Sequence, residues 1–113
     1  MKRIIAMIRP VLRDDVISAL HQIEDFPGAS MFEVKKVRRG IKQKHKEDQE
    51  PLALDFPLYV RFEIICRNSL VPVLVETIRA NAHTGKPGDG KIIVSSVESA
   101  LRIYDRKEDK EAL

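Results

Sequence analysis

The order strand, helix, strand occurs twice along this chain, and this order limits the folds that the chain can adopt. Short runs rich in β-branched or alternating apolar residues predict strands over residues 2–9, 30–38, 57–67 and 91–97. Apolar side chains at helical spacing predict helices over residues 12–23 and 68–82. The chain therefore reads as two successive β-α-β units.

Two such units predict an α+β domain of the ferredoxin-like βαββαβ type, with an antiparallel sheet and both helices on one face. The length of 113 residues suits a single domain over 1–113. Apolar strand residues such as Ile4 and Ile8, or their alternates, would otherwise face water, so we expect a homo-oligomer that covers the second sheet face. A short fifth strand is expected over 100–105, and the charged tail 105–113 is expected to fray.

A long polar segment separates the two units. Residues 39–55 are charged and have no clear period over most of their length, and a loop of this length is usually functional or disordered. We expect it to be mobile until a partner orders it. A second hypothesis is a metal site at His45, with Glu47 and Asp48 nearby, although no spacing in the segment resembles a zinc site.

A glycine-rich loop, residues 83–91 ("HTGKPGDGK"), connects the second helix to the fourth strand. It contains Gly85, Gly88 and Gly90. Glycine admits positive φ and close approach to a ligand, so successive N–H groups can form an anion-binding nest, to which Lys86 and Lys91 add charge. Asp89 either fixes the loop by hydrogen bonds or faces a ribose or a cation. The alternative is an ordinary turn with solvated lysines.

Composition argues against several other classes of function. Twenty basic and seventeen acidic residues give a net charge of +3, and aromatic residues make up only 5%, so nucleic-acid binding has little support. The single cysteine, Cys66, excludes an internal disulfide and lies in an apolar run that predicts burial. No apolar stretch reaches the roughly 20 residues that span a bilayer. We expect a soluble cytoplasmic protein without an enzymatic site, since no nucleophile elbow or acid/base pair is evident.

The glycine loop also carries a resemblance to a known family. The run "TGKPGDGKIIV", residues 84–94, closely resembles the nucleotide-binding signature of the PII signal-transduction family. Residues 1–20 are similar to the opening strand and helix of that family. Further similar segments, "EVKKVR", "DFP" and "LRIYD", follow at family-like distances, so the resemblance covers nearly the whole chain.

The resemblance implies a ferredoxin-like homotrimer that is not an enzyme and that binds ATP or ADP, with AMP as a further candidate, in the clefts between subunits. It leaves a role for Mg2+ open. In the family, the bound nucleotide sets the shape of the long loop, here 39–55, which docks on a transporter, enzyme or regulator. Such proteins regulate nitrogen or carbon metabolism.

The resemblance also assigns site residues by position. The residues that would surround the phosphates are Gly88, Asp89, Gly90 and Lys91. Two basic residues, Arg39 at the root of the long loop and Arg102, would reach a phosphate. Ser30 would meet the adenine and Ile65 would line the base. The loop is completed by Thr84, Gly85 and Lys86.

This chain departs from the family pattern at several positions. Gly40 replaces the glutamine that helps hold Mg2+ and 2-oxoglutarate, and Gln43 lies three residues further on. Leu52 replaces the modified tyrosine, so uridylylation is not expected. Lys36 replaces a glycine, and Tyr104 replaces a second phosphate-facing arginine. These departures imply a divergent member without classical 2-oxoglutarate sensing, and they favour ADP or AMP over ATP.

A second hypothesis keeps the fold and changes the function. A metal-binding trimer similar to the CutA family would use the long loop, and His45 in particular, as its ligand site. The glycine loop argues against this hypothesis, because such proteins do not need a phosphate nest.

Overall fold

A four-stranded antiparallel sheet forms the frame of the molecule. The computed structural model describes residues 1–39 and 54–113. The strands are β1 (Lys2–Ile8), β2 (Ser30–Lys35), β5 (Leu58–Cys66) and β6 (Lys91–Ser96). They lie in the order β2-β5-β1-β6, with every neighbouring pair antiparallel. All four predicted strands are confirmed, and the ferredoxin-like α+β class with them.

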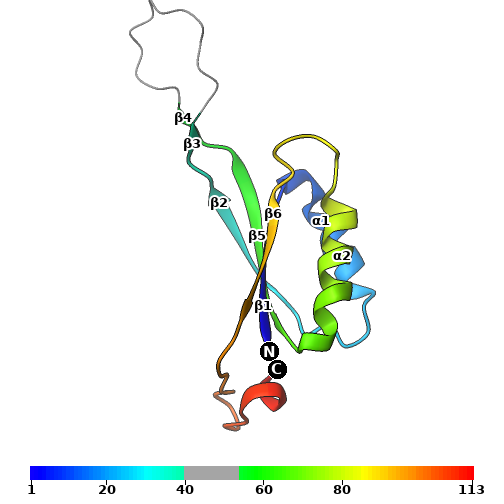
Figure 1. Ribbon diagram of the computed structural model, residues 1–113, viewed down its shortest axis with the longest axis vertical. Coiled ribbons are helices and arrows are strands. Elements are labelled where there is room, and N and C mark those ends of the chain that lie inside the picture. The colour runs from blue at the N-terminus through cyan, green and yellow to red at the C-terminus, as the bar shows by residue number, and fades with distance from the viewer. Residues whose placement is uncertain (40–53) are drawn as a thin grey trace, which may run out of the picture.

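Both helices pack on the same face of this sheet (Figure 1). The helices are α1 (Arg13–His21) and α2 (Val71–Ala82), each preceded by a 3-10 turn, η1 (Pro10–Leu12) and η2 (Asn68–Leu70). A proline lies in the first turn of η1 and of α2, where the missing N–H has no intrahelical acceptor to serve. The predicted helix over 68–82 is therefore a 3-10 turn followed by an α-helix.

The hydrophobic core lies between the helices and one face of the sheet. Ile4, Ala6 and Ile8 of β1 point into it and are at most 1% exposed, because alternate residues of a strand face the same side. Leu74 and Ile78 of α2 pack against them and are fully buried. Cys66 is also buried, as predicted, and burial raises the pKa of its thiol.

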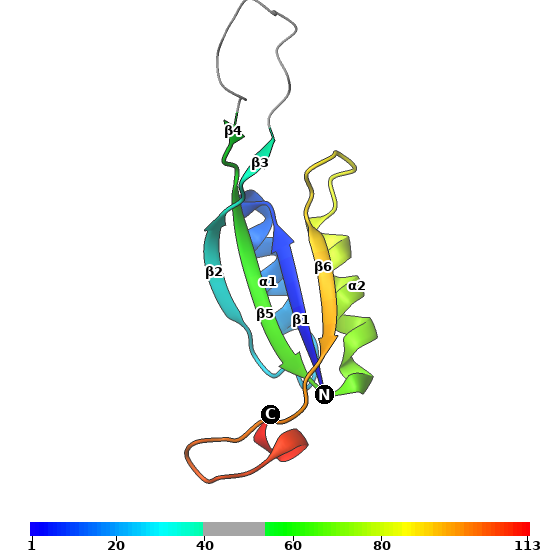
Figure 2. The same cartoon turned by 60° about the vertical axis from the view of Figure 1, so that its left-hand side comes forward.

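The opposite face of the sheet has no cover in the described part of the chain. Figure 2 looks onto this face, with the helices behind the strands. We call it the open face. The register places Ile5 of β1 beside Ile93 of β6 there, and Ile93 is 49% exposed. Phe32 of β2 is 47% exposed on the same face.

The two ends of the predicted long loop are paired with each other. Two short strands, β3 (Arg38–Arg39) and β4 (Leu54–Asp55), form an antiparallel ribbon that continues outward from β2 and β5 (Figure 1). Residues 39, 54 and 55, at the two edges of the predicted loop, therefore lie in these short strands. The predictions that concern Gly40, Gln43, His45 and Leu52 lie outside the described residues.

The C-terminal segment is folded, but not as a strand. The predicted fifth strand over 100–105 is wrong: Leu101 forms an isolated bridge with Glu108, and a turn follows it. Backbone hydrogen bonds within the segment, such as Asp109 N–H to the Ala100 carbonyl at 2.8 Å, replace pairing with the sheet. The tail that was expected to fray ends instead in a 3-10 turn, η3 (Asp109–Ala112).

Candidate functional site

The glycine loop runs from the end of α2 to the start of β6 at one end of the sheet (Figure 1). Gly85, Gly88 and Gly90 have φ values of 84°, 95° and 105°, a region that residues with side chains rarely adopt. Gly90 has a second constraint, because a Cβ at this position would overlap the carbonyl oxygen of Met7. The glycines are therefore required by the path of the loop past β1.

The carboxylate of Asp89 organises this loop. Its Oδ2 accepts hydrogen bonds from the backbone N–H groups of Thr84, at 2.8 Å, and Gly85, at 3.1 Å. Its Oδ1 accepts from the Thr84 hydroxyl and from Nε of Arg9, at 3.0 Å. These donors, the Thr84 hydroxyl first, hold the pKa of Asp89 far below its usual range. Of the two roles considered for Asp89, the geometry gives the one that fixes the loop.

Two residues that the sequence did not single out tie the loop to the sheet. Arg9, just after β1, also donates from Nη2 to the Pro87 carbonyl at 2.9 Å. The Tyr59 hydroxyl of β5 donates to the Gly88 carbonyl at 3.1 Å. Neither contact has a local sequence signal, because the partners lie 78 and 29 residues apart. The loop is thus held from two strands before any ligand arrives.

This arrangement divides the backbone donors of the loop into two groups. The N–H groups of Thr84 and Gly85 are used by Asp89, and that of Lys86 donates to the Thr84 hydroxyl. In the described part of the chain, the N–H groups of Gly88 and Asp89 make no hydrogen bond. An incoming anion would therefore meet the second half of the loop.

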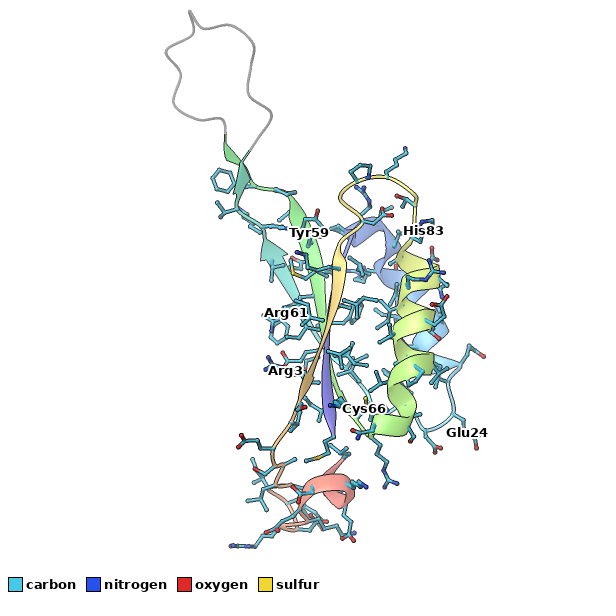
Figure 3. All side chains as sticks on the ribbon, in the orientation of Figure 1. Arg3, Glu24, Tyr59, Arg61, Cys66 and His83 are labelled. Atoms are coloured by element: carbon cyan, nitrogen blue, oxygen red, sulfur yellow. The ribbon has the colours of Figure 1, made fainter. Side chains whose placement is uncertain are left out.

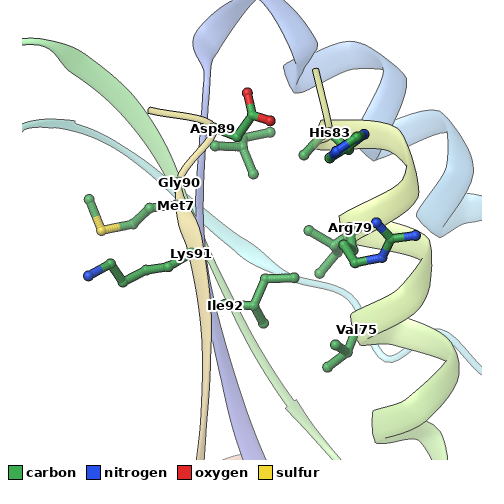
Figure 4. A pocket seen from close by; sticks show the side chains of 11 residues that line it. Met7, Val75, Arg79, His83, Asp89, Gly90, Lys91 and Ile92 are labelled. Atoms are coloured by element: carbon green, nitrogen blue, oxygen red, sulfur yellow. The ribbon is translucent and has the colours of Figure 1, made fainter. Parts of the chain in front are cut away.

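A mostly apolar groove of about 410 Å³ lies beside the loop, between α2 and β6 (Figure 4). Val75, Ile78 and Ile92 line its apolar part. The polar residues that line it are Arg79, His83, Asp89 and Lys91, and the Lys91 side chain points away from α2, on the same side as Met7 (Figure 4). Lys91 is exposed at the start of β6, opposite Met7, and Lys86 is exposed in the loop. The lysines are thus free to meet a ligand at this end of the molecule.

The remaining predicted site residues lie away from the loop. Ser30 pairs with Glu63, and Ile65 pairs with Arg3, toward the other end of the strands. Arg102 belongs to the C-terminal segment, which lies at the end of the sheet opposite the glycine loop (Figure 1). The side chain of Arg39, in β3, is outside the described structure. One chain therefore brings residues 84–91 together but does not bring Ser30, Ile65 or Arg102 to them.

Arg102 is already engaged within its own segment. Its Nε donates to Oδ1 of Asp105 at 3.1 Å, and its Nη2 donates to the Glu111 carbonyl at 2.7 Å. The C-terminal turn thus holds the Arg102 guanidinium at that end of the molecule, where Asp105 partly neutralises its charge.

A family model described as nitrogen regulatory protein P-II matches residues 1–108. The chain belongs to the PII family. Its relatives include the nitrogen regulatory protein P-II of Haemophilus influenzae, 39% identical over 116 residues, and that of Azospirillum brasilense, 34% identical over 113 residues. The P-II 1 protein of Escherichia coli is 36% identical over 113 residues. In all three comparisons the match covers 100% of both chains.

PII membership confirms the family resemblance and makes the chain a signal-transduction regulator by family. It does not favour the CutA-like alternative. Within residues 1–39 and 54–113 there is no group of three or more histidine, cysteine or acidic side chains that could hold a metal. Neither of the two described helices is long and apolar enough to cross a bilayer.

Proposed function

We propose that this PII protein is a non-catalytic, cytoplasmic sensor of adenine nucleotides. The observation that carries the proposal is the glycine loop, which presents two lysines and the free N–H groups of Gly88 and Asp89 from a rigid frame. Preorganised donors of this kind suit a phosphate group. ATP, ADP and AMP, with or without Mg2+, are the candidate ligands.

The separation of the predicted residues supports a site shared between subunits. The glycine loop lies at one end of the sheet, whereas Arg102, Ser30 and Ile65 lie toward the other (Figure 1). Two different patches of this kind can meet in a head-to-tail contact, and such contacts generate closed rings when the rotation closes. A homotrimer, as the family resemblance implies, would complete one nucleotide site at each junction.

The output of the sensor would be carried by the segment 39–55. The β3–β4 ribbon pairs the two ends of this segment and continues outward from β2 and β5 (Figure 1). Arg39 lies at this base, so a phosphate that it reached would connect the nucleotide to the segment. The partner would be a transporter, enzyme or regulator in nitrogen or carbon metabolism.

Calorimetric titration with ATP, ADP and AMP, each with and without Mg2+ and 2-oxoglutarate, tests the proposal. We expect about one nucleotide per subunit, with Lys91→Ala and Arg102→Ala each weakening binding by about tenfold or more, since charged hydrogen bonds to phosphate are lost. Arg13→Ala, in α1 on the helix face, is the control. Unchanged binding in both variants would contradict the assignment of Lys91 and Arg102 to the nucleotide site. Tighter ATP binding in the presence of 2-oxoglutarate would contradict the expectation that Gly40, in place of glutamine, removes 2-oxoglutarate sensing.

A further inference from the structure

The open face carries a charged cluster at its centre that the proposed nucleotide site does not use. Arg3 of β1 and the pair Arg61 and Glu63 of β5 point away from the helices, as their register requires. Figure 3 shows both arginines on the side of the sheet opposite α1 and α2. The register places apolar Ile5 and Phe32 beside this cluster, and Ser30 and Ser95 are its small polar neighbours.

One carboxylate serves both guanidinium groups in this cluster. Oε1 of Glu63 lies 3.7 Å from Nη1 of Arg3, and Oε2 lies 3.4 Å from Nη2 of Arg61. The Arg61 guanidinium also lies 5.9 Å from the centre of the Phe32 ring. Both ion-pair distances are long for charge-assisted hydrogen bonds, which are usually about 2.7–2.9 Å.

The two arginines keep unused donors. Nε of Arg3 and Nε of Arg61 are both buried, and neither has a hydrogen-bond partner within the described part of the chain. A buried donor without an acceptor costs free energy. An acceptor supplied from outside the chain would therefore stabilise this cluster. The charges also do not balance: two guanidinium groups face a single carboxylate, which leaves one positive charge per chain.

No further carboxylate from the sheet can correct this surplus. The described residues of the four strands include only two acidic side chains, Glu33 and Glu63. Glu33 pairs with buried Val60 and therefore lies on the helix side. Glu63 is thus the single carboxylate that these strands place on the open face.

Symmetry preserves this imbalance when the open face is covered by further copies of the chain. Each copy adds two arginines and one glutamate, so the ratio in the covered core stays at two to one. Burial of unpaired guanidinium groups is strongly unfavourable unless an opposite charge is present. In a ring of three subunits the surplus would be three positive charges near the axis.

We propose that the open-face cluster of Arg3, Arg61 and Glu63 binds a small oxyanion of the phosphate or sulfate class, enclosed when the subunits assemble. The planar fork of a guanidinium group matches the oxygens of such anions, and the free Nε atoms supply donors for them. This inference rests on the homotrimer of the proposed function, but its ligand site is separate from the glycine loop.

Thermal unfolding of the full chain in increasing sulfate, at constant ionic strength and with saturating ADP, tests the inference. The ADP keeps sulfate from acting through the glycine loop, and a Lys91→Ala background serves the same purpose. We expect a saturable rise in Tm of about 5 °C or more for the wild type, because a ligand of the folded state stabilises it. Inorganic phosphate should give a similar rise.

Two variants should shift this response in opposite directions. Arg61→Gln should abolish the saturable rise, whereas Glu63→Gln, which increases the positive surplus, should lower the sulfate concentration needed for half of the effect. Arg13→Gln is the control, because Arg13 is also paired with one carboxylate and its side chain is 41% exposed, against 36% for Arg61. It should retain the full response.

The outcomes separate this inference from the proposed function. A trimer that binds ADP but has no saturable sulfate response would overturn the anion site alone, and so would a weaker response in Glu63→Gln. If Arg61→Gln does not assemble, the sulfate concentration that gives half of the effect in Glu63→Gln still tests the anion site. Failure to bind ADP with an intact sulfate response would overturn the nucleotide assignment and leave the anion site standing. A monomeric chain would overturn the anion site and the shared nucleotide site together.

Discussion

Asp89 is the residue on which the geometry of the glycine loop depends most directly. Its carboxylate accepts four hydrogen bonds, from the N–H and hydroxyl groups of Thr84, from the N–H of Gly85 and from Nε of Arg9, which directly follows β1. Only the ionised carboxylate can accept all of these bonds at once. Its depressed pKa therefore has a consequence for the dependence of loop stability on pH.

A group whose pKa is lower in the folded state stabilises that state above its unfolded pKa and loses this contribution as the pH falls. For Asp89 the ordinary value is 3.8, so the contribution is complete near neutral pH and declines below about 4. We expect Asp89→Asn to lower the hydrogen-exchange protection of the Thr84 and Gly85 amides by about tenfold at neutral pH.

The difference between wild type and Asp89→Asn should then shrink as the pH is lowered through 4 toward 2. Asp15→Asn on the surface of α1 is the matched control and should leave both amides unchanged. A difference that stayed constant over this range would show that the Asp89 carboxylate is not what holds the loop.

At the scale of elements, the C-terminal turn controls what Arg102 can do. Asp105 accepts from Nε of Arg102 and also from the backbone N–H of Lys107, so it shapes the turn and competes for the guanidinium charge. Under the proposed function a phosphate would have to share Arg102 with Asp105.

Asp105→Asn keeps an acceptor in the turn and removes the competing charge. We expect it to tighten ADP binding by about two- to fivefold, the size of a partly exposed ion pair, when measured by calorimetry. Asp15→Asn again serves as the control for a change of one charge. Weaker binding in Asp105→Asn would mean that Asp105 positions Arg102 for the ligand instead of competing with it.

At the scale of the whole molecule, the open face exposes apolar side chains that nothing covers in the described part of the chain. A single layer of helices leaves Ile5, Phe32 and Ile93 on the other side of the sheet, where half-exposed apolar side chains favour association. This is the face that the proposed trimer would cover.

Ile93→Glu should therefore weaken assembly. We expect the association constant to fall by more than about tenfold, since a carboxylate would have to be buried among apolar groups, and sedimentation velocity measures the loss. Val73→Glu is a matched control, because Val73 on α2 is 44% exposed, close to the 49% of Ile93. Equal assembly of both variants and the wild type would exclude the open face as the subunit interface.

The sequence by itself determined the elements, because their signals are local. The short isoleucine-rich run that ends at Pro10 predicted β1, and the spacing of Val16 and Leu20 predicted α1, since both signals can be read over a few residues. Three glycines within six residues likewise identified the loop of 83–91 as a place of unusual backbone conformation, which the positive φ values confirm. The family resemblance followed from the same short run.

Only the tertiary structure decided how distant residues meet. Arg9 reaches Asp89 across 80 residues, and Tyr59 reaches Gly88 across 29, because β1 and β5 are central strands whose ends lie beside the loop. The turn that holds Arg102 and replaces the expected fifth strand depends on hydrogen bonds within the folded C-terminal segment. The cluster of Arg3, Arg61 and Glu63 exists because antiparallel register aligns two strands that are far apart in the sequence. The period of apolar residues along one element shows which of its faces is apolar. The pairing and packing of elements determine which charged residues from distant parts of the sequence become neighbours.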